Sequence, residues 1–315
     1  MKKIVVIGEI LVEIMADTPG HGFREAQALT GPFPSGAPAI FAAQAARIGQ
    51  PVAIVSAVGD DDFGRLNLDR LARDGVDVSG VHVDPHRPTG SAFVRYRGDG
   101  GRDFVFNIRH SACGHLHDTP AVRSVLASAD HLHVMGSSLA SPEFVARNMA
   151  AAEAVRDHGG TISFDPNLRK EILAAPGMAE AMSRIVSMTD LYLPSGDELT
   201  LLTEAQTDVT AIGELLDRGV RAIVHKRGAD GAGYHDAHHD LSIPAFEVTE
   251  VDPTGAGDCF GATFTALWLR GVPPKSALQT AAASGAHAVT RRGPMEGTAD
   301  LATLEDFIRA QEADR

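Results

Sequence analysis

The residues best suited to chemistry lie at 251–258, which read Val-Asp-Pro-Thr-Gly-Ala-Gly-Asp and lead into the apolar run 259–269. Apolar residues in this run recur at helical spacing, which predicts a helix that starts near Gly257. Backbone N–H groups at a helix start lack intrahelical acceptors and carry partial positive charge, so they attract anions. Because Gly255 and Gly257 have no Cβ, a phosphate oxygen can approach the main chain there.

A carboxylate follows this predicted anion cradle, by which we mean Gly255, Ala256 and Gly257. Asp258 could take a proton from a hydroxyl while the cradle neutralises a transferring phosphoryl group. The pattern therefore predicts phosphoryl transfer with Asp258 as the base. The alternative for a lone Gly-Ala-Gly-Asp is a capped helix with an acidic first turn and no catalytic role.

The run Asp-Pro-Thr-Gly-Ala-Gly-Asp resembles the carboxy-terminal signature of the ribokinase-like carbohydrate kinases, also called the phosphofructokinase-B family. In that family the last Asp is the catalytic base for a sugar hydroxyl, and the amides before it form the anion hole. The resemblance implies these roles for Asp258 and the cradle, and it covers nearly the whole chain. The sequence has no P-loop, and its first strand lacks the Gly-x-Gly-x-x-Gly of a dinucleotide site, so a Walker-type ATPase and a dehydrogenase are not supported.

Length and composition set further bounds. With 315 residues the chain can bury a large core. Its 28 basic and 41 acidic residues give a net charge of −13 without a basic run, which argues against a nucleic-acid or membrane partner. Cys113 and Cys259 are its only cysteines, which fits a reduced cytoplasmic setting. Glu9 interrupts the apolar run 4–7, so that run predicts a first strand rather than a signal peptide.

Strand and helix patterns alternate along most of the chain, which predicts an α/β fold. Short β-branched runs at 4–7 and 52–58 suit central parallel strands, whose carboxyl ends face the ligand in such folds. The resemblance implies a ribokinase-like, doubly wound and mostly parallel sheet flanked by helices, with a small β lid. We therefore expect a single kinase domain over residues 1–315.

The lid is expected in two parts of the chain. Runs 89–96 and 104–108 stand on either side of a Gly-rich turn, which predicts a hairpin. Residues from about 16 to 34, rich in Gly, Pro and polar residues, are expected to provide lid and connection. The lid is thus assigned to segments within about 10–34 and 88–110.

One segment resembles the family's opening and departs from it at a single position. In Gly-Glu-Ile-Leu-Val-Glu at 8–13, the last acidic residue corresponds to the one that binds sugar hydroxyls in the family. Glu13 stands where Asp is more usual, so its carboxylate reaches one methylene further. The alternative for Glu13 is a solvated carboxylate at a strand end.

The run 35–42 resembles the family's Gly-Gly-x-x-x-Asn before a helix. This resemblance implies that Gly36 and Ala37 lie at the substrate. Ser35 replaces the first Gly of the pattern, and Ile40 replaces the Asn that usually hydrogen-bonds the sugar. Losing that amide removes a donor and an acceptor from the pocket.

The lid strand at 106–112 carries a clue about substrate charge. In relatives that phosphorylate 2-keto-3-deoxygluconate, it resembles Tyr-Tyr-Arg-x-x-Ser-Ala, and its Arg holds the substrate carboxylate. Here Ile108 stands in that place, and Arg109 is expected on the opposite face of the strand. Asn107 could hydrogen-bond a neutral hydroxyl or carbonyl. A neutral sugar is therefore predicted.

Two further motifs resemble elements on the phosphate side of the family's site. Asp-Pro-Asn-Leu-Arg at 165–169 resembles Asp-x-Asn-x-Arg and implies that Arg169, a permanent cation, lies near the transferred phosphoryl group. Ser-Gly-Asp-Glu at 195–198 resembles Asn-x-x-Glu and implies that Glu198 acts on Mg²⁺ through bound water. The alternatives are a surface ion pair for Arg169 and a helix-start acid for Glu198.

The run 226–232 resembles the strand end and Gly loop that line the family's ATP site. The resemblance implies a set of nucleotide contacts: Lys226, Gly228, Gly231, Gly255, Gly257 and, where Asn often stands on the adenine side, Ser284. By the same resemblance, Asp252 and Thr254 mark a site for a monovalent cation such as K⁺.

Together these features predict an ATP-dependent sugar kinase that uses Mg²⁺ and phosphorylates a primary hydroxyl. The whole-chain pattern looks most similar to tagatose kinases, which act on a neutral ketohexose. The alternatives within the family are a fructokinase and a 2-keto-3-deoxygluconate kinase. A non-catalytic sensor of sugar or nucleotide that kept the fold is the alternative from another functional class. Because a two-stranded lid alone would be marginal, we also expect a homodimer formed through the lids.

Overall fold

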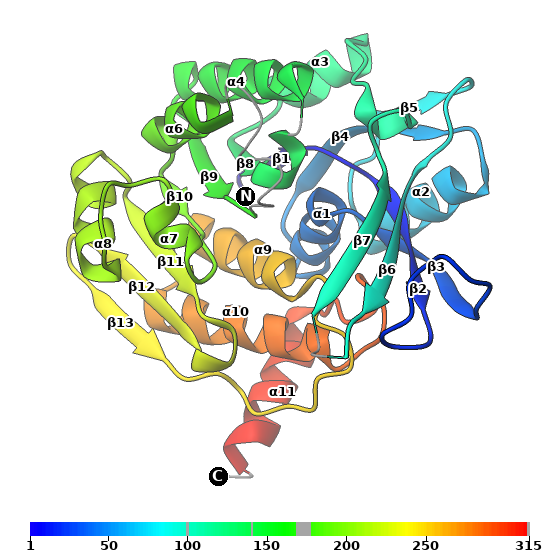
Figure 1. Ribbon diagram of the computed structural model, residues 1–315. Coiled ribbons are helices and arrows are strands. Elements are labelled where there is room, and N and C mark those ends of the chain that lie inside the picture. The colour runs from blue at the N-terminus through cyan, green and yellow to red at the C-terminus, as the bar shows by residue number, and fades with distance from the viewer. Residues whose placement is uncertain (99–100, 140, 168–177, 314–315) are drawn as a thin grey trace.

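The computed structural model describes residues 1–98, 101–139, 141–167 and 178–313, apart from the side chain of residue 179. Within them a large sheet has the strand order β13-β12-β11-β10-β9-β8-β1-β4-β5 (Figure 1). Neighbours from β5 to β11 run parallel, and β12 and β13 are antiparallel additions at one edge. The strands are β1 (Ile4–Ile7), β4 (Val52–Gly59), β5 (Val81–Asp84), β8 (His131–Met135), β9 (Thr161–Asp165), β10 (Leu191–Tyr192), β11 (Ala222–Lys226), β12 (Ala232–Asp236) and β13 (Asp240–Ile243).

Helices cover both faces of this sheet, as the doubly wound prediction requires (Figure 1). One face packs against α3 (Pro120–Ala127), α4 (Pro142–Asp157), α6 (Met178–Met188), α7 (Glu198–Leu201) and α8 (Asp208–Asp217). The other face packs against α1 (Ala37–Arg47), α2 (Asp62–Asp74), α9 (Ala256–Leu269) and α10 (Pro274–Val289), with α11 (Leu301–Ala313) outside α10. Short 3₁₀ turns complete the order at Ala112–Gly114, Gly136–Leu139 and Gly228–Asp230.

The central strands are buried on both faces, which explains their continuous apolar sequences. All four side chains of β1 are fully buried, so the predicted first strand is confirmed. Two histidines of β8 lie inside this core: ring nitrogens of His131 and His133 each lie 2.7 Å from the Ser163 hydroxyl. Burial lowers the pKa of His131 to about 3, so its ring is neutral and packed at neutral pH.

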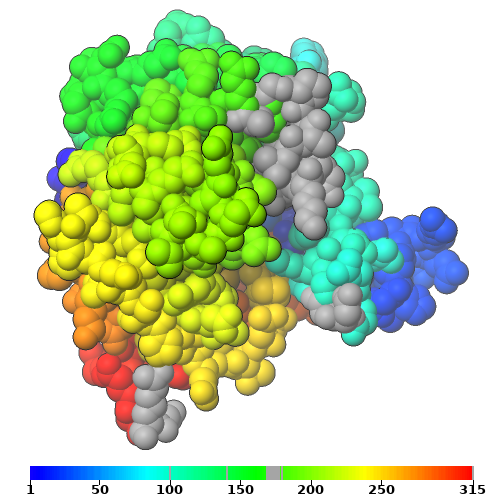
Figure 2. Space-filling view, turned by 60° about the vertical axis from the view of Figure 1, so that its left-hand side comes forward, coloured from blue at the N-terminus to red at the C-terminus, as the bar shows by residue number. Residues whose placement is uncertain are grey.

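A second sheet forms the lid, and the described residues give it four strands in the order β3-β2-β6-β7. These are β2 (Leu11–Ala16), β3 (Leu29–Ser35), β6 (Gly90–Tyr96) and β7 (Arg102–Asn107). The expected hairpin is the antiparallel pair β6 and β7, and β2 lies parallel to β6. The hairpin is thus half of a larger sheet, and β2 and β3 already cover one of its edges. In the space-filling view the blue and cyan lid segments project from one side of the body (Figure 2).

The register of the lid strands separates two faces. Glu13 pairs with Ala92, and Ala92 pairs with Phe106, so their side chains share one face. We call this the inner face, because Tyr96, which has the same parity as Ala92 on β6, hydrogen-bonds Asp252 of the body. The opposite, outer face carries the alternate residues of each strand. Among the helices of the described residues, none has the length and apolar character to cross a membrane.

Candidate active site

The anion cradle lies where helix α9 begins. α9 starts at Ala256 with Gly255 as its N-cap, so the predicted start near Gly257 is confirmed to within one residue. Gly255 has a left-handed φ of 83°, and a Cβ there would lie 2.4 Å from the carbonyl oxygen of Pro294. Only glycine fits this turn without strain. The start of α9 is therefore a turn that requires glycine at position 255.

Among the described residues outside the backbone of α9 itself, one ammonium group lies close to Gly257. A Cβ on Gly257 would lie 3.8 Å from the Lys226 Nζ. Lys226 ends β11 and forms an ion pair of 2.5 Å with Asp165, which ends β9. Both side chains are less than 10% exposed. A phosphate at the cradle would thus meet backbone amides and a lysine together.

Asp165 is a site residue that the sequence analysis did not single out, although it opens the motif of Arg169. Burial raises the pKa of the Asp165 carboxyl, and the adjacent Lys226 opposes that rise. The second turn of α9 approaches the same carboxylate, because a Cβ on Gly261 would lie 3.6 Å from Asp165 Oδ2. Arg169 itself lies outside the described residues.

The loop before the cradle is built around Asp252, which is 1% exposed. Its Oδ1 accepts hydrogen bonds from the Tyr96 hydroxyl (2.8 Å) and the Thr254 amide (3.0 Å), and its Oδ2 accepts one from the Gly293 amide (2.9 Å). Arg102 Nη1 donates to the Thr254 hydroxyl over 2.8 Å. Burial, with the neighbouring Asp252 charge, raises the pKa of Tyr96, so the phenol stays protonated and donates. Neither Tyr96 nor Arg102 carried a motif in the sequence.

Two residues that differ from the family pattern, Glu13 and Ser35, meet where the sugar is expected to bind. Glu13, on the inner face of the lid, is 3% exposed, and its Oε2 accepts a hydrogen bond of 3.3 Å from the Ser35 hydroxyl. The longer carboxylate therefore meets the hydroxyl that replaces a glycine. Gly36 caps α1 with a φ of 111°, and a Cβ there would lie 2.4 Å from the Glu9 carbonyl oxygen. Half-buried Ala37 begins the helix.

Ile40 stands where the family pattern has an asparagine, and its side chain belongs to an apolar cluster. It is 2% exposed, within the apolar cluster that includes Cys259 and Ala262 of α9. Its Cγ2 would lie 3.2 Å from a Cβ on Gly255. The side chain therefore packs beneath the cradle turn and links the starts of α1 and α9.

Asn107 does not lie with Glu13. It pairs with Ser91 at the end of β7, and its Nδ2 donates to the Ser91 hydroxyl over 3.2 Å on the outer face of the lid. The predicted contact with a substrate is not supported by this position. The strand also ends at Asn107, so Ile108 and Arg109 follow it, and strand alternation does not govern where Arg109 points.

Three other predicted residues have structural partners. The Glu198 Oε2 accepts a hydrogen bond of 2.7 Å from the Ser195 amide, as in a helix-start cap. Ser284 is 1% exposed inside the contact of α9 with α10, where its hydroxyl donates to the Cys259 carbonyl over 3.3 Å, so a direct nucleotide contact is not supported. A Cβ on Gly231 would lie 2.0 Å from the Ile243 carbonyl oxygen, whereas Gly228 is exposed with open space around it.

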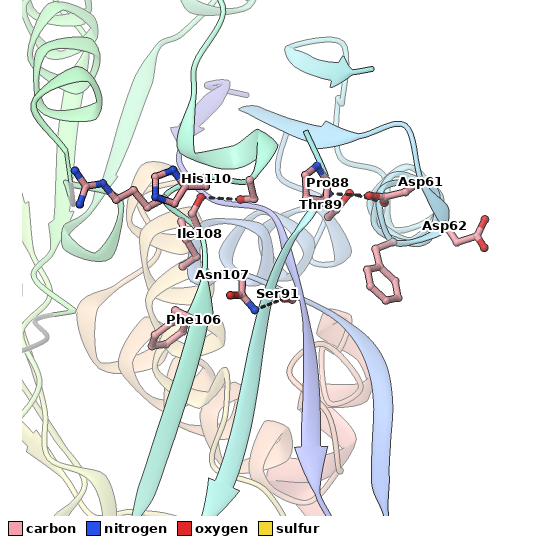
Figure 3. A pocket seen from close by; sticks show the side chains of 12 residues that line it. Asp61, Asp62, Pro88, Thr89, Ser91, Phe106, Asn107, Ile108 and His110 are labelled. Carbon is pink, nitrogen blue, oxygen red and sulfur yellow. Dashed lines mark hydrogen bonds between the residues drawn. The ribbon is translucent and has the colours of Figure 1, made fainter. Parts of the chain in front are cut away.

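A cavity of about 680 Å³ lies at the base of the lid (Figure 3). It lies between the start of α2, where Asp61 accepts hydrogen bonds from the Thr89 amide (2.8 Å) and hydroxyl (2.7 Å), and the segment 106–111. Neither Asp258 nor Glu13 is among its lining residues. Across the described residues, no group of three or more His, Cys, Asp or Glu side chains is placed to hold a metal ion.

Comparisons with known proteins decide the family. The model of the pfkB family carbohydrate kinases matches residues 1–300. The chain belongs to this family. The 2-dehydro-3-deoxygluconokinase of Thermoproteus tenax is 31% identical over 98% of this chain and 95% of its own. An E. coli protein provisionally named ribokinase II, solved in complex with ATP and Mg²⁺, is 47% identical with a TM-score of 0.93 over 98% of this chain and all of its own.

A fructokinase double mutant from Vibrio cholerae, solved with fructose, ADP and potassium ion bound, is 27% identical with a TM-score of 0.82 over 98% of each chain. The ribokinase-like fold prediction is confirmed by these likenesses, and this pfkB family member is a sugar kinase. Because the chain belongs to a family of enzymes, the comparisons support a sugar kinase rather than a non-catalytic sensor.

The open space at Gly257 generates a test of the cradle in this kinase. Gly257→Ala should place a methyl group where a phosphate oxygen would approach, lowering kcat/KM for ATP about tenfold or more. Folding should be kept, since among the described residues the neighbour that the new Cβ at position 257 would meet is the end of a flexible lysine. Steady-state kinetics and thermal melting measure the two effects. Gly213→Ala, a helical substitution in open space within α8, is the matched control. Unchanged kinetics for Gly257→Ala would contradict the cradle.

Proposed function

We propose that this sugar kinase transfers the γ-phosphoryl group of ATP to a primary hydroxyl of a neutral ketohexose, with tagatose favoured. The observation that carries the proposal is the open start of α9, with Asp258 in its first turn and the Lys226–Asp165 pair beside Gly257. Asp258 would accept the proton of the sugar hydroxyl, and the amides of the cradle would neutralise the charge of the moving phosphoryl group. Membership in the family establishes that the reaction is phosphorylation of a sugar. The choice of ATP as the phosphoryl donor and of tagatose as the acceptor is our inference.

The nucleotide side has residues that fit a phosphate-rich ligand. Exposed Gly228 and the open approach to Gly257 leave backbone accessible, and Lys226 supplies a nearby cation. When bound, Mg²⁺ would screen the phosphate charges, and Glu198 would reach it only through water. The related protein solved with ATP and Mg²⁺ supports this choice of donor.

A monovalent cation is proposed near Asp252 and Thr254, supported by the potassium ion in the related fructokinase. The Asp252 carboxylate already receives hydrogen bonds from the protein, so backbone carbonyls of the loop would have to supply further ligands. Equal turnover rates in potassium chloride and in tetramethylammonium chloride would refute the proposed cation site.

Replacing the proposed base tests the reaction. Asp258→Asn should keep the fold and ATP binding but lower kcat by about 10³-fold or more, because an amide cannot take the hydroxyl proton. Coupled ADP release measures turnover. Asp62→Asn, which removes an exposed first-turn acid from α2, controls for loss of helix-start charge and should keep wild-type rates. Wild-type turnover in Asp258→Asn would remove Asp258 as the base.

The lid favours an uncharged sugar. Next to Glu13, the inner face presents Ala92 and Phe106, with no cation between them. Arg95 and Arg97 both pair with Asp103 near the end of the lid, so neither is aimed at Glu13. A sugar acid would need a cation that binds its carboxylate, which these contacts do not supply.

Comparing kcat/KM for tagatose, fructose, psicose, sorbose and 2-keto-3-deoxygluconate tests the substrate. Tagatose should lead by about tenfold or more, because a site built on hydrogen bonds to particular hydroxyls rejects epimers that leave its polar groups unpaired. A higher kcat/KM for fructose than for tagatose would be compatible with a neutral pocket but would refute the assignment of tagatose as the substrate. A preference for the sugar acid would refute the neutral pocket and would mean that another cation binds the carboxylate, with Arg95, Arg97 and Arg109 as the candidates.

We also propose a homodimer through the outer faces of the lids, in a cytoplasmic setting that suits two buried free thiols. Ile14, Phe93 and Val105 adjoin one another on this face, and Val105 is 50% exposed. An exposed apolar patch on a small sheet is more stable when a second copy of the chain covers it than when it faces water. Sedimentation at micromolar concentration should give twice the mass of the chain, and a monomer would reject the dimer.

A further inference from the structure

The lid touches the catalytic loop through the ends of two strands. Tyr96 is the last residue of β6, Arg102 is the first residue of β7, and the two are paired in the antiparallel register. Their side chains therefore project together from the inner face. Tyr96 donates to Asp252 and Arg102 donates to Thr254, each over 2.8 Å.

The loop that they hold leads directly into the cradle. Residues 252–254 precede Gly255, the N-cap of α9, so any shift of the loop moves the first-turn amides. The body fixes the loop from one side, through the Gly293 amide on Asp252 and the Pro294 carbonyl oxygen against Gly255. The lid fixes it from the other side through Tyr96 and Arg102. The amides are thus positioned by two parts of the protein.

Strand β7 also carries two aromatic side chains, Phe104 and Phe106, on the inner face that it shares with Glu13. The Arg102 guanidinium lies 5.8 Å from the centre of the Phe104 ring, and the Phe104 and Phe106 rings stack with centroids 5.1 Å apart. Phe106 is two pairings across the sheet from Glu13. A continuous row on one face of the lid therefore joins the sugar side of the site to the phosphate side.

We propose that Tyr96 and Arg102 are positioning residues for phosphoryl transfer: from the lid they set the geometry of the Asp252–Thr254 loop and hence of the cradle amides. This inference rests on the proposed role of the cradle and Asp258. Donors that are misplaced by about 1 Å stabilise the transition state much less, while binding of the sugar at Glu13 is little changed. The two residues therefore act on kcat rather than on the KM for the sugar.

The variants Tyr96→Phe and Arg102→Gln each remove one of these hydrogen bonds. Each should lower kcat by about 10-fold to 100-fold, while the KM for the sugar changes by less than about 3-fold. Full kinetics with both substrates and thermal melting are measured on each variant. Tyr96→Phe removes a single oxygen atom, so it keeps the test usable if Arg102→Gln is unstable.

Two control variants separate positioning of the loop from other effects of altering the lid. Arg95→Gln removes a cation from the same lid, but on the outer face, where it pairs with Asp103 over 2.8 Å. Asp17→Asn breaks the lid's ion pair with Arg292 of the body (2.6 Å), which does not involve Asp252 or Thr254. Both controls should keep kcat within about 3-fold of wild type.

Two outcomes would overturn the inference: a raised sugar KM with wild-type kcat in the Tyr96 and Arg102 variants, or equal losses of kcat in the control variants. The first would mean that the contacts serve only to bind sugar, and the second that any lid attachment matters equally. Failure of the proposed function is recognised separately, because it would appear as full activity in Asp258→Asn. The inference about the lid is judged only on an enzyme in which Asp258 is required.

Discussion

The buried ion pair between Lys226 and Asp165 is the interaction on which the proposed phosphate side of the site depends. Neither charge could be buried alone at reasonable cost, but together they satisfy one another at the carboxyl edge of the sheet. Since β10 lies between β9 and β11, the pair joins the ends of the two strands that flank β10, beside Gly257. An ammonium group has three N–H donors, and in the described structure Asp165 accepts from one of them, which is compatible with the proposed contact of Lys226 with a phosphate.

Much of the fold and the cradle could be predicted because their signals are local. The apolar run of β1 and the helical spacing after Gly257 depend on neighbouring residues, and both lie where the sequence placed them. Tyr96 and Arg102 could not be found in this way. Their partners are 156 and 152 residues away, and a lone Tyr or Arg on a lid strand has no pattern of its own. The expectation for Asn107 stays a prediction: contact with a substrate depends on which face of the strand a residue occupies, and the register places Asn107 on the face opposite Glu13.

Positions that differ from the family pattern also proved hard to interpret one at a time. Glu13 and Ser35 belong to different motifs, yet their side chains meet, and the Ser35 hydroxyl donates to the Glu13 carboxylate. Ser284 looked like a polar replacement facing a nucleotide, but it satisfies a carbonyl between two helices. In each case the partner of the altered residue, which only the folded chain brings near, decided its meaning.

Ile40 shows how such a change becomes difficult to reverse. Its side chain is buried among the residues that support the Gly255 turn, so the position serves the packing of α1 on α9. An asparagine placed there alone would put an amide in an apolar cluster, where its hydrogen-bonding groups would need partners that the cluster lacks. Introducing the family's residue at this position would therefore disturb the start of α9 unless neighbouring side chains changed with it.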